Sequence, residues 1–442
     1  MLKLRIASPR VWQTVRVKEV TYSMFQTRLG NGMRVVGESM PGYRSVSMGV
    51  WINAGSVYET ENESGAAHFI EHMLFKGTKT RSASRIAEEM DAVGGNLNAF
   101  TSKECTCFYG RVLGKHLGVL SDMLADLLCN SLLDPDDIER EKGVVSEEIL
   151  MTEDTPEDLV TETAVSGFYE GDPLEKPILG TVGSVRSFTR EGLKSYMDRL
   201  YRADNMVISA AGDLDWDELV ASLEKSFAVR SGARGAAVPF GMHVPGKRMK
   251  TVVKDIEQVH LCVCLPGFPK DTPENYAQLL FSNAFGGSMS SRLFQRIREE
   301  RGLAYSVYSY PAAYKQSGML TLYAGTGAEN ALTVARMLMD EVRAVREGGL
   351  TKEELERAKD QLVSSFLMSQ ESTSARSSAI GRAELLRGSH LSEEEVIGNI
   401  RTVTMENIEA ILPAVCDTGD VSACAVGRCA GLEDELRRIL IG

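Results

Sequence analysis

Two periodicities of apolar residues run along the chain. Residues 45–52, Ser-Val-Ser-Met-Gly-Val-Trp-Ile, alternate small or polar with larger apolar side chains, which predicts a β-strand with one buried face. In other segments the apolar residues recur three and four positions apart, the period of an amphipathic helix. After that strand, these periods predict the following elements: helices near 64–76 and 83–93, a strand pair around 96–112, and helices near 115–130 and 135–152.

The second half of the chain repeats this order of elements. The predicted elements are a strand at 259–265, helices near 273–285 and 290–300, strands at 304–312 and 317–325, and helices at 328–346 and 351–371. Residues between the halves are rich in Gly, Ala and Pro, a composition typical of a linker. The repeat predicts two homologous α+β domains, at 23–228 and 248–442, joined by a linker at 229–247.

The helix near 64–76 carries the most informative side chains. His68, Glu71 and His72 form an H-x-x-E-H segment. Residues four apart on a helix have Cβ atoms roughly 5–6 Å apart, so the two imidazoles can bind one metal ion. Glu71 projects toward the same region and can hold a water that the metal polarises, which is the inverzincin arrangement. A purely structural His pair is the alternative, but burying two imidazoles and an acid without partners costs several kcal/mol.

A catalytic zinc commonly takes a third protein ligand, often a carboxylate. The helix near 135–152 offers candidates, with Asp134 as its N-cap and Pro135 as its first residue. Glu141 and Glu148 lie seven residues apart and share a face, whereas Glu147 points about 100° away from Glu148. Spacing alone leaves open which of Glu147 and Glu148 faces the metal, and whether the helix is simply a solvated acidic one.

The two halves differ in chemistry. The helix that corresponds to 64–76 in the second half begins Asn275-Tyr-Ala-Gln and contains no metal-binding residues. We therefore expect one zinc ion per chain, held in the first domain, and a degenerate second copy with a different task.

Composition narrows the class of protein. The chain has 442 residues, 43% of them hydrophobic and 25% charged, as in ordinary globular proteins. A net charge of −12 argues against general nucleic-acid binding. No apolar run reaches the ~18 residues of a membrane span, and no signal-peptide core is present, so we expect no membrane association.

The cysteines and the N-terminal residues indicate the cellular compartment in which the protein is expected. The eight cysteines include no C-x-x-C motif, and Cys105/Cys107 and Cys262/Cys264 occupy alternate positions of strand-like runs. This favours a reduced, intracellular compartment. Residues 1–22 are basic but poor in serine, so we predict a loosely ordered extension rather than a transit peptide.

The chain resembles the pitrilysin/insulinase family of zinc peptidases (peptidase M16), in its short, processing-peptidase-like bacterial and mitochondrial branch. Besides the H-x-x-E-H segment, the resemblance rests on three further segments: Leu29–Met33, Gly94–Thr101 and Phe285–Phe294. It implies that His68, His72 and Glu148 bind zinc and that Glu71 is the general base. Glu141 then orients a ligand imidazole from the second shell. The implied fold of each domain is a mostly antiparallel sheet packed with helices, half of a clamshell.

The resemblance also implies how a peptide is bound. Arg298 and Tyr305 match the pair that the family uses to bind the scissile carbonyl and stabilise its oxyanion. The substrate is expected to lie extended along the strand containing Asn98, Ala99 and Phe100, paired through main-chain hydrogen bonds. The resulting prediction is a zinc-dependent metalloendopeptidase that hydrolyses unfolded or extended peptides, with leader peptides as one substrate class.

Two domains supply only half of the four-domain chamber of larger relatives. Since the zinc ligands lie in the first domain and Arg298 and Tyr305 in the second, we expect a homodimer with composite active sites. A heterodimer with a metal-free sister subunit is the alternative. A non-catalytic assembly subunit is a further alternative, which loss of the zinc residues would favour, but this chain retains all of them.

Overall fold

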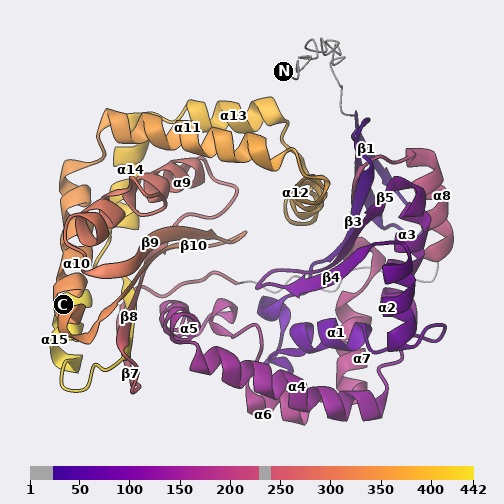
Figure 1. Cartoon of the computed structure of the whole chain (residues 1–442), viewed down its shortest axis with the longest axis horizontal. Coiled ribbons are helices and arrows are strands. Elements are labelled where there is room, and N and C mark those ends of the chain that lie inside the picture. Colours follow the sequence, from indigo (N-terminus) through magenta and orange to yellow (C-terminus); the bar gives the residue numbers. More distant parts are fainter. Residues whose placement is uncertain (1–22, 228–239) are drawn as a thin grey trace, which may run out of the picture.

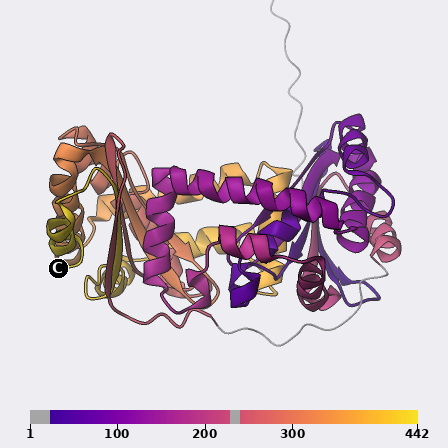
Figure 2. The same cartoon turned by 90° about the horizontal axis from the view of Figure 1, so that it is seen from below.

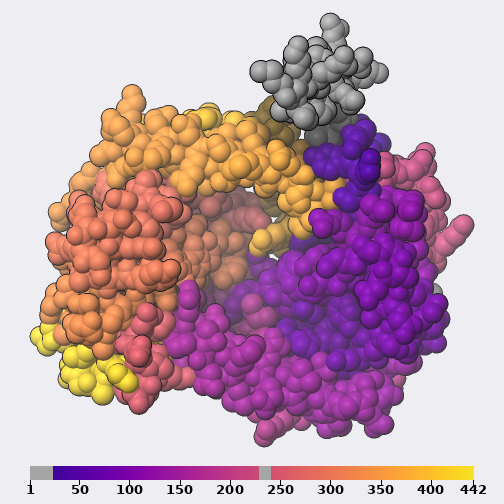
Figure 3. Space-filling model, in the orientation of Figure 1, coloured from indigo at the N-terminus to yellow at the C-terminus, as the bar shows by residue number. Residues whose placement is uncertain are grey.

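The computed structural model describes residues 23–227 and 240–442, which form two α+β units around a central hollow (Figures 1 and 3). The extension predicted at 1–22 and most of the predicted linker lie outside the described residues. No helix of the described ranges is long and apolar enough to cross a membrane. All eight cysteines are free thiols.

The first unit is built on a six-stranded sheet in the order β1-β2-β6-β3-β5-β4. Neighbouring strands are antiparallel except for the parallel pair β2–β6. Its strands are β1 (Ser23–Arg28), β2 (Arg34–Ser39), β3 (Ser45–Ile52), β4 (Asn96–Thr101), β5 (Thr106–Leu113) and β6 (Met206–Gly212). Its helices are α1 (Ala66–Leu74), α2 (Ala83–Ala92), α3 (Leu117–Asn130), α4 (Pro135–Asp154), α5 (Pro156–Phe168), α6 (Val182–Ser187), α7 (Arg190–Leu200) and α8 (Trp216–Ser226).

The second unit has a five-stranded sheet in the order β7-β11-β8-β10-β9, with the pair β7–β11 parallel. Its strands are β7 (Lys247–Val253), β8 (Gln258–Gly267), β9 (Ala304–Ala313), β10 (Gly318–Gly327) and β11 (Val421–Gly427). Its helices are α9 (Pro273–Phe285), α10 (Ala331–Gly348), α11 (Lys352–Ser369), α12 (Thr373–Leu386), α13 (Glu393–Arg401), α14 (Met405–Val415) and α15 (Glu433–Leu440). Strands β4 and β9 are each an edge of their sheet.

The two units exchange helices. Helix α5, from the first half of the chain, packs on β7, β8 and β11 of the second sheet, whereas α12, from the second half, packs on β2, β3 and β6 of the first (Figures 1 and 2). The α12 contact is close because Gly381 has no side chain: a Cβ there would lie 2.2 Å from the Trp51 indole nitrogen. Each sheet is therefore completed by a helix from the other half.

The mostly antiparallel two-domain α+β fold predicted from the sequence is confirmed, and every predicted helix and strand has a counterpart within a few residues. One differs in kind: the helix predicted near 290–300 is largely a π-helix, Phe294–Glu299. π-Helical turns occur often at functional positions, and this one carries Arg298.

Candidate active site

Helix α1 begins at an unusual cap. Gly65 has φ 89°, a left-handed conformation that glycine adopts without strain. The carboxylate of Glu59 accepts hydrogen bonds of 2.8 Å from the backbone N–H groups of Gly65 and Ala67, so it serves as the cap. Burial raises the pKa of Glu59 to about 8, although these two hydrogen bonds oppose the shift. Sequence reasoning placed the start of this helix correctly but missed Glu59, which lies upstream of the motif.

The structure brings His68, His72 and Glu148 together. One possible ligand atom from each lies within 4.8 Å of the other two. The Nε2 atoms of His68 and His72 lie 3.7 Å and 3.4 Å from the two oxygens of Glu148. Glu147, the alternative carboxylate on α4, is exposed. The packing of α4 against α1 thus turns Glu148, rather than Glu147, toward the histidines.

These separations suit a tetrahedral zinc ion. Zinc–ligand bonds of about 2.0–2.2 Å place neighbouring ligand atoms roughly 3.3–3.6 Å apart, whereas direct hydrogen bonds would draw them to about 2.7–3.2 Å. The donor set of two imidazoles and one carboxylate is also one that catalytic zinc commonly uses. The cluster therefore fits zinc with a position left for water.

Glu141 fixes the state of His72. The Nδ1–H of His72 donates to Glu141 Oε1 at 2.9 Å, and the Nε2 atom of the same ring lies 3.4 Å from Glu148. Lys76 holds the other oxygen of Glu141 at 2.6 Å. Burial would raise the pKa of Glu141, but the hydrogen bonds from His72 and Lys76 outweigh it and lower that pKa. Glu141 is thus an ionised acceptor that orients the His72 imidazole.

His68 has no such partner. Its Nδ1 atom is buried and lacks a hydrogen bond to any described residue. Burial, with a smaller contribution from His72, lowers the pKa of His68 to about 4. The imidazole is therefore neutral near pH 7, the form that binds metal.

Glu71 is hydrogen-bonded to the edge strand β4. Its Oε2 accepts a 2.6 Å hydrogen bond from the hydroxyl of Thr101, the last residue of β4. Burial raises the pKa of Glu71, with the Thr101 hydrogen bond acting in the opposite direction. Because one carboxylate oxygen is anchored on β4, the orientation of Glu71 relative to that edge strand is fixed.

A cavity of about 770 Å³ adjoins the cluster. His68 and Glu71 line it from α1, and Ala99, Phe100 and Thr101 line it from β4. Asn98 is exposed on the same edge strand but is not among the lining residues. The opposite wall comes from the second domain of the same chain, through Tyr308, Tyr310, Ala312, Tyr314 and Met319. Sequence reasoning did not identify this aromatic wall.

Arg298 and Tyr305 lie next to each other but away from this cavity. The guanidinium of Arg298 donates to the Tyr305 carbonyl at 2.8 Å and stands 4.7 Å from the centre of its ring. The Tyr305 side chain is 75% exposed. Neither residue lines the cavity beside the His68–His72–Glu148 cluster. Within one chain, Arg298 and Tyr305 are therefore not brought to that cluster.

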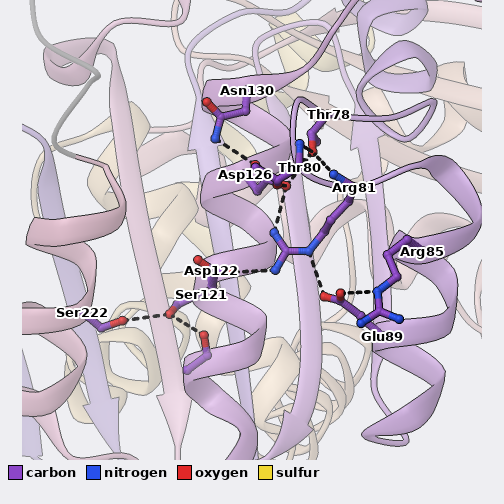
Figure 4. A network of polar contacts seen from close by, with 11 residues as sticks. Thr78, Thr80, Arg81, Arg85, Glu89, Ser121, Asp122, Asp126, Asn130 and Ser222 are labelled. Atoms are coloured by element: carbon purple, nitrogen blue, oxygen red, sulfur yellow. Dashed lines mark hydrogen bonds and ion pairs between the residues drawn. The ribbon is translucent and has the colours of Figure 1, made fainter.

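A polar network fixes the chain that leaves α1 (Figure 4). Asp126 on α3 is buried and accepts hydrogen bonds from Thr78, Thr80, Arg81 and Asn130. Arg81 also pairs with Glu89 of α2 and Asp122 of α3. The network therefore ties the loop after α1 to the two helices behind it.

The start of α4 is fixed by a strained residue. Leu133 has φ 45°, and it is the one non-glycine residue with positive φ among the described residues. The Nε–H of Arg190 donates to the Leu133 carbonyl at 2.9 Å. The next residue, Asp134, is the N-cap of α4. The angle at which Glu141 and Glu148 reach α1 depends on this turn.

Comparisons with known proteins agree with the geometry. Residues 34–182 match the family Insulinase (Peptidase family M16), and residues 187–362 match Peptidase M16 inactive domain. The chain is 42% identical over 383 residues to the uncharacterized zinc protease YmxG of Bacillus subtilis, covering 86% of this chain and 93% of that one. An uncharacterized zinc protease of Streptomyces coelicolor, SCO5738, is 38% identical over 394 residues, covering 87% of this chain and 86% of that one.

A solved structure has the same fold. The crystal structure of a protease from Helicobacter pylori superposes with a TM-score of 0.85 at 19% identity, covering 92% of this chain and 99% of that one. At this level of identity the similarity concerns the fold alone.

Proposed function

The chain belongs to the insulinase family of peptidases (M16) and is a zinc metalloprotease, and from that premise we propose that it is an endopeptidase of extended peptides with Glu71 as its general base. The observation that carries the proposal is the cluster of His68, His72 and Glu148 at zinc-ligand spacing beside the anchored Glu71.

His68, His72 and Glu148 would hold one zinc ion per chain. When bound there, zinc polarises a water molecule and lowers its pKa toward about 7. Glu71 accepts a proton from the attacking water on the carboxylate oxygen that Thr101 does not occupy. It then donates that proton to the amine that leaves when the peptide bond breaks. The raised pKa of Glu71, which burial causes, suits a group that must both accept and release a proton.

The peptide is proposed to add to the free edge of β4. Extended chains bind an edge strand through main-chain hydrogen bonds, with little dependence on sequence. Asn98, Ala99 and Phe100 provide that edge, and it leads to Thr101 and so to Glu71. An unfolded segment or a leader peptide can adopt this conformation, whereas a folded domain cannot.

The oxyanion donors are proposed to come from a second copy of the chain. Arg298 and Tyr305 are paired with each other, and Tyr305 is largely exposed, as a residue that serves a partner's site would be. The assembly would be a homodimer with two composite sites, in the bacterial cytoplasm; a heterodimer with a metal-free subunit would need a different chain to supply these groups.

Zinc content and cleavage of a quenched fluorescent peptide test the enzyme. We expect about one zinc per chain, activity lost on chelation and regained with zinc. Glu71→Gln should retain zinc and lose roughly 10²–10⁴-fold in kcat, the usual contribution of a general base. Full activity of this variant would contradict the role of Glu71.

Mixed dimers test the composite site. Glu71→Gln chains and Tyr305→Phe chains are each expected to be impaired. In a one-to-one mixture, half of the dimers regain one intact site, so activity should recover to roughly a quarter of the wild-type value. Absence of recovery in verified mixed dimers would contradict sharing between subunits.

A further inference from the structure

A second cavity, of about 670 Å³, lies in the second domain beside the start of α9. The beginning of α9, the chain just after α12, and helices α13 and α14 enclose it. Lys270, Asn275, Arg387 and Leu391 are among its lining residues, together with the apolar side chains of Val403 and Ile411. None of these residues takes part in the zinc cluster.

Most polar groups that line this cavity already have partners. Thr272 donates to the carbonyl of Pro269, and Asn399 donates to the hydroxyl of Tyr276. The Asn407 amide oxygen accepts from the backbone N–H of Thr404, the N-cap residue of α14. Two buried atoms remain without a hydrogen bond to any described residue: Asn275 Oδ1 and Arg387 Nε. Asn275 is only 8% exposed, and buried amide oxygens are normally hydrogen-bonded, so this oxygen is a suitable acceptor for an N–H group of a ligand.

Two basic side chains, Lys270 and Arg387, and two acidic ones, Asp271 and Glu274, line the cavity. The Lys270 ammonium makes no hydrogen bond or ion pair within residues 23–227 and 240–442 that would neutralise it directly, and Arg387 reaches Asp271 only at 3.7 Å. Burial, with Arg382 and Arg387 nearby, lowers the pKa of Lys270 to about 8. Asp271 and Glu274 are exposed whereas Lys270 and Arg387 are half-buried, so the basic groups of the lining lie deeper than its acidic ones. The buried acid Glu104, which is not part of the lining, also attracts Lys270.

We infer that this cavity binds the free C-terminal end of a peptide. Lys270 and Arg387 would pair with the terminal carboxylate, and Asn275 Oδ1 would accept the N–H of the last peptide bond. The last side chain would pack on Tyr276, Leu391 and Ile411. The exposed acids disfavour ligands of high negative charge, such as nucleoside triphosphates, and leave a single carboxylate as the matching anion.

This site would act together with the zinc site, and in that respect it rests on the proposed function. The backbone N–H of Lys270 donates to the carbonyl of Tyr314 at 2.9 Å, and Tyr314 lines the cavity of about 770 Å³ beside His68 and Glu71. The two cavities thus lie on either side of one backbone contact. A peptide whose C-terminus is held at Lys270 would be retained near the catalytic site while an internal bond is cleaved.

Binding is tested with N-acetyl-leucine and its amide, N-acetyl-leucinamide, by calorimetric titration of the zinc-loaded full chain. The acid should bind at least tenfold more tightly than the amide. Lys270→Met and, separately, Arg387→Gln should each weaken the acid at least tenfold, with thermal midpoints used to verify folding. Lys352→Met, which changes an exposed lysine at the start of α11, is the matched control and should bind as the wild type does.

Equal binding of acid and amide, or no saturable binding, would overturn the inference. It would also be overturned if both folded variants, Lys270→Met and Arg387→Gln, kept the wild-type affinity.

A kinetic measurement separates this site from the enzyme itself. One peptide is compared with a free and with an amidated C-terminus; the free acid should show the lower KM at equal kcat, and Lys270→Met should remove the difference. If the wild type cleaves neither peptide, the proposed function fails while the binding result still stands. Equal KM values for the two peptides in an active wild-type enzyme would contradict C-terminal anchoring.

Discussion

The helix pair α1–α4 of the first domain and the pair α9–α11 of the second occupy equivalent positions and have opposite chemistry. In each, a helix that follows a long strand of the sheet packs against a later helix of the same unit. The first pair encloses His68, His72, Glu141 and Glu148. The second encloses Ala277, Phe281, Leu355 and Ala358, which belong to a continuous apolar core.

The difference separates what the fold requires from what the site requires. Apolar residues at this contact stabilise the second unit by about 25 cal/mol per Å² of buried area. In the first unit, charged groups occupy this contact in place of apolar ones, and charged groups are costly to bury without partners. A metal ion would serve as the partner of the two imidazole Nε2 atoms and Glu148, so we expect the first domain to depend on zinc and the second domain not to.

Glu148→Gln should have the largest effect on zinc binding by the first domain. It removes the anionic ligand, so zinc affinity should fall by more than about 100-fold, beyond the range typical of outer-shell changes. Competition with a chromophoric chelator measures the loss. Glu147→Gln, the neighbouring exposed acid, is the matched control and should keep wild-type affinity. If the control loses zinc instead, the assignment of Glu148 is wrong.

Glu141→Gln should have the next largest effect. Without an ionised acceptor the His72 imidazole is less well oriented and less basic, and zinc affinity should drop by about 10–100-fold. The same chelator competition measures it. The zinc-free variant should melt below zinc-free wild type, because the hydrogen bonds from His72 and Lys76 outweigh the cost of burying the Glu141 charge. Unchanged zinc affinity in the folded variant would mean that Glu141 stabilises the fold and does not orient His72.

Gly381→Ala tests whether the helix exchange joins the two units. The added methyl group would collide with Trp51 and Ser209, with an expected cost of roughly 1–3 kcal/mol. Thermal unfolding should show a lowered midpoint. Gly398→Ala in α13, where no atom lies within 4 Å of the new Cβ, should instead raise it slightly. Equal midpoints for the two variants would show that α12 can move away from the first sheet at little cost.

Thr101→Val should have the smallest effect. It removes the 2.6 Å hydrogen bond to Glu71 while keeping the shape of the side chain. Hydrogen bonds to charged groups contribute about 1.5–3 kcal/mol, so kcat should fall by about tenfold or somewhat more, with zinc content unchanged. Thr101→Ser keeps the hydroxyl and should stay near wild-type activity. A loss of zinc in Thr101→Val would assign this residue to the metal cluster rather than to Glu71.

Much of the fold could be predicted from local patterns. The spacing of apolar residues located α1, α3, α4, α9 and α11 because a helix repeats every 3.6 residues wherever it lies. The short buried strands β6 and β11 escaped prediction: all seven residues of each are buried, so neither shows an alternating pattern. Helix α12 was missed for a related reason, since it is buried through small and hydroxyl side chains such as Ser377 and Gly381.

The sequence by itself determined which groups share a helix face: His68, Glu71 and His72 on one helix, and Glu141 with Glu148 on another. Dihedral preferences and helical periodicity are local, so they are written in consecutive residues. Only the tertiary structure decided that Glu148 rather than Glu147 meets the histidines. It also decided that Tyr308 and Tyr310 of the second domain line the cavity beside the cluster, and that Arg298 and Tyr305 do not. These relations depend on how distant elements pack, including the turn at Leu133 and the exchange of α5 and α12. Many contacts, each worth little, combine to set that packing, and no single segment encodes it.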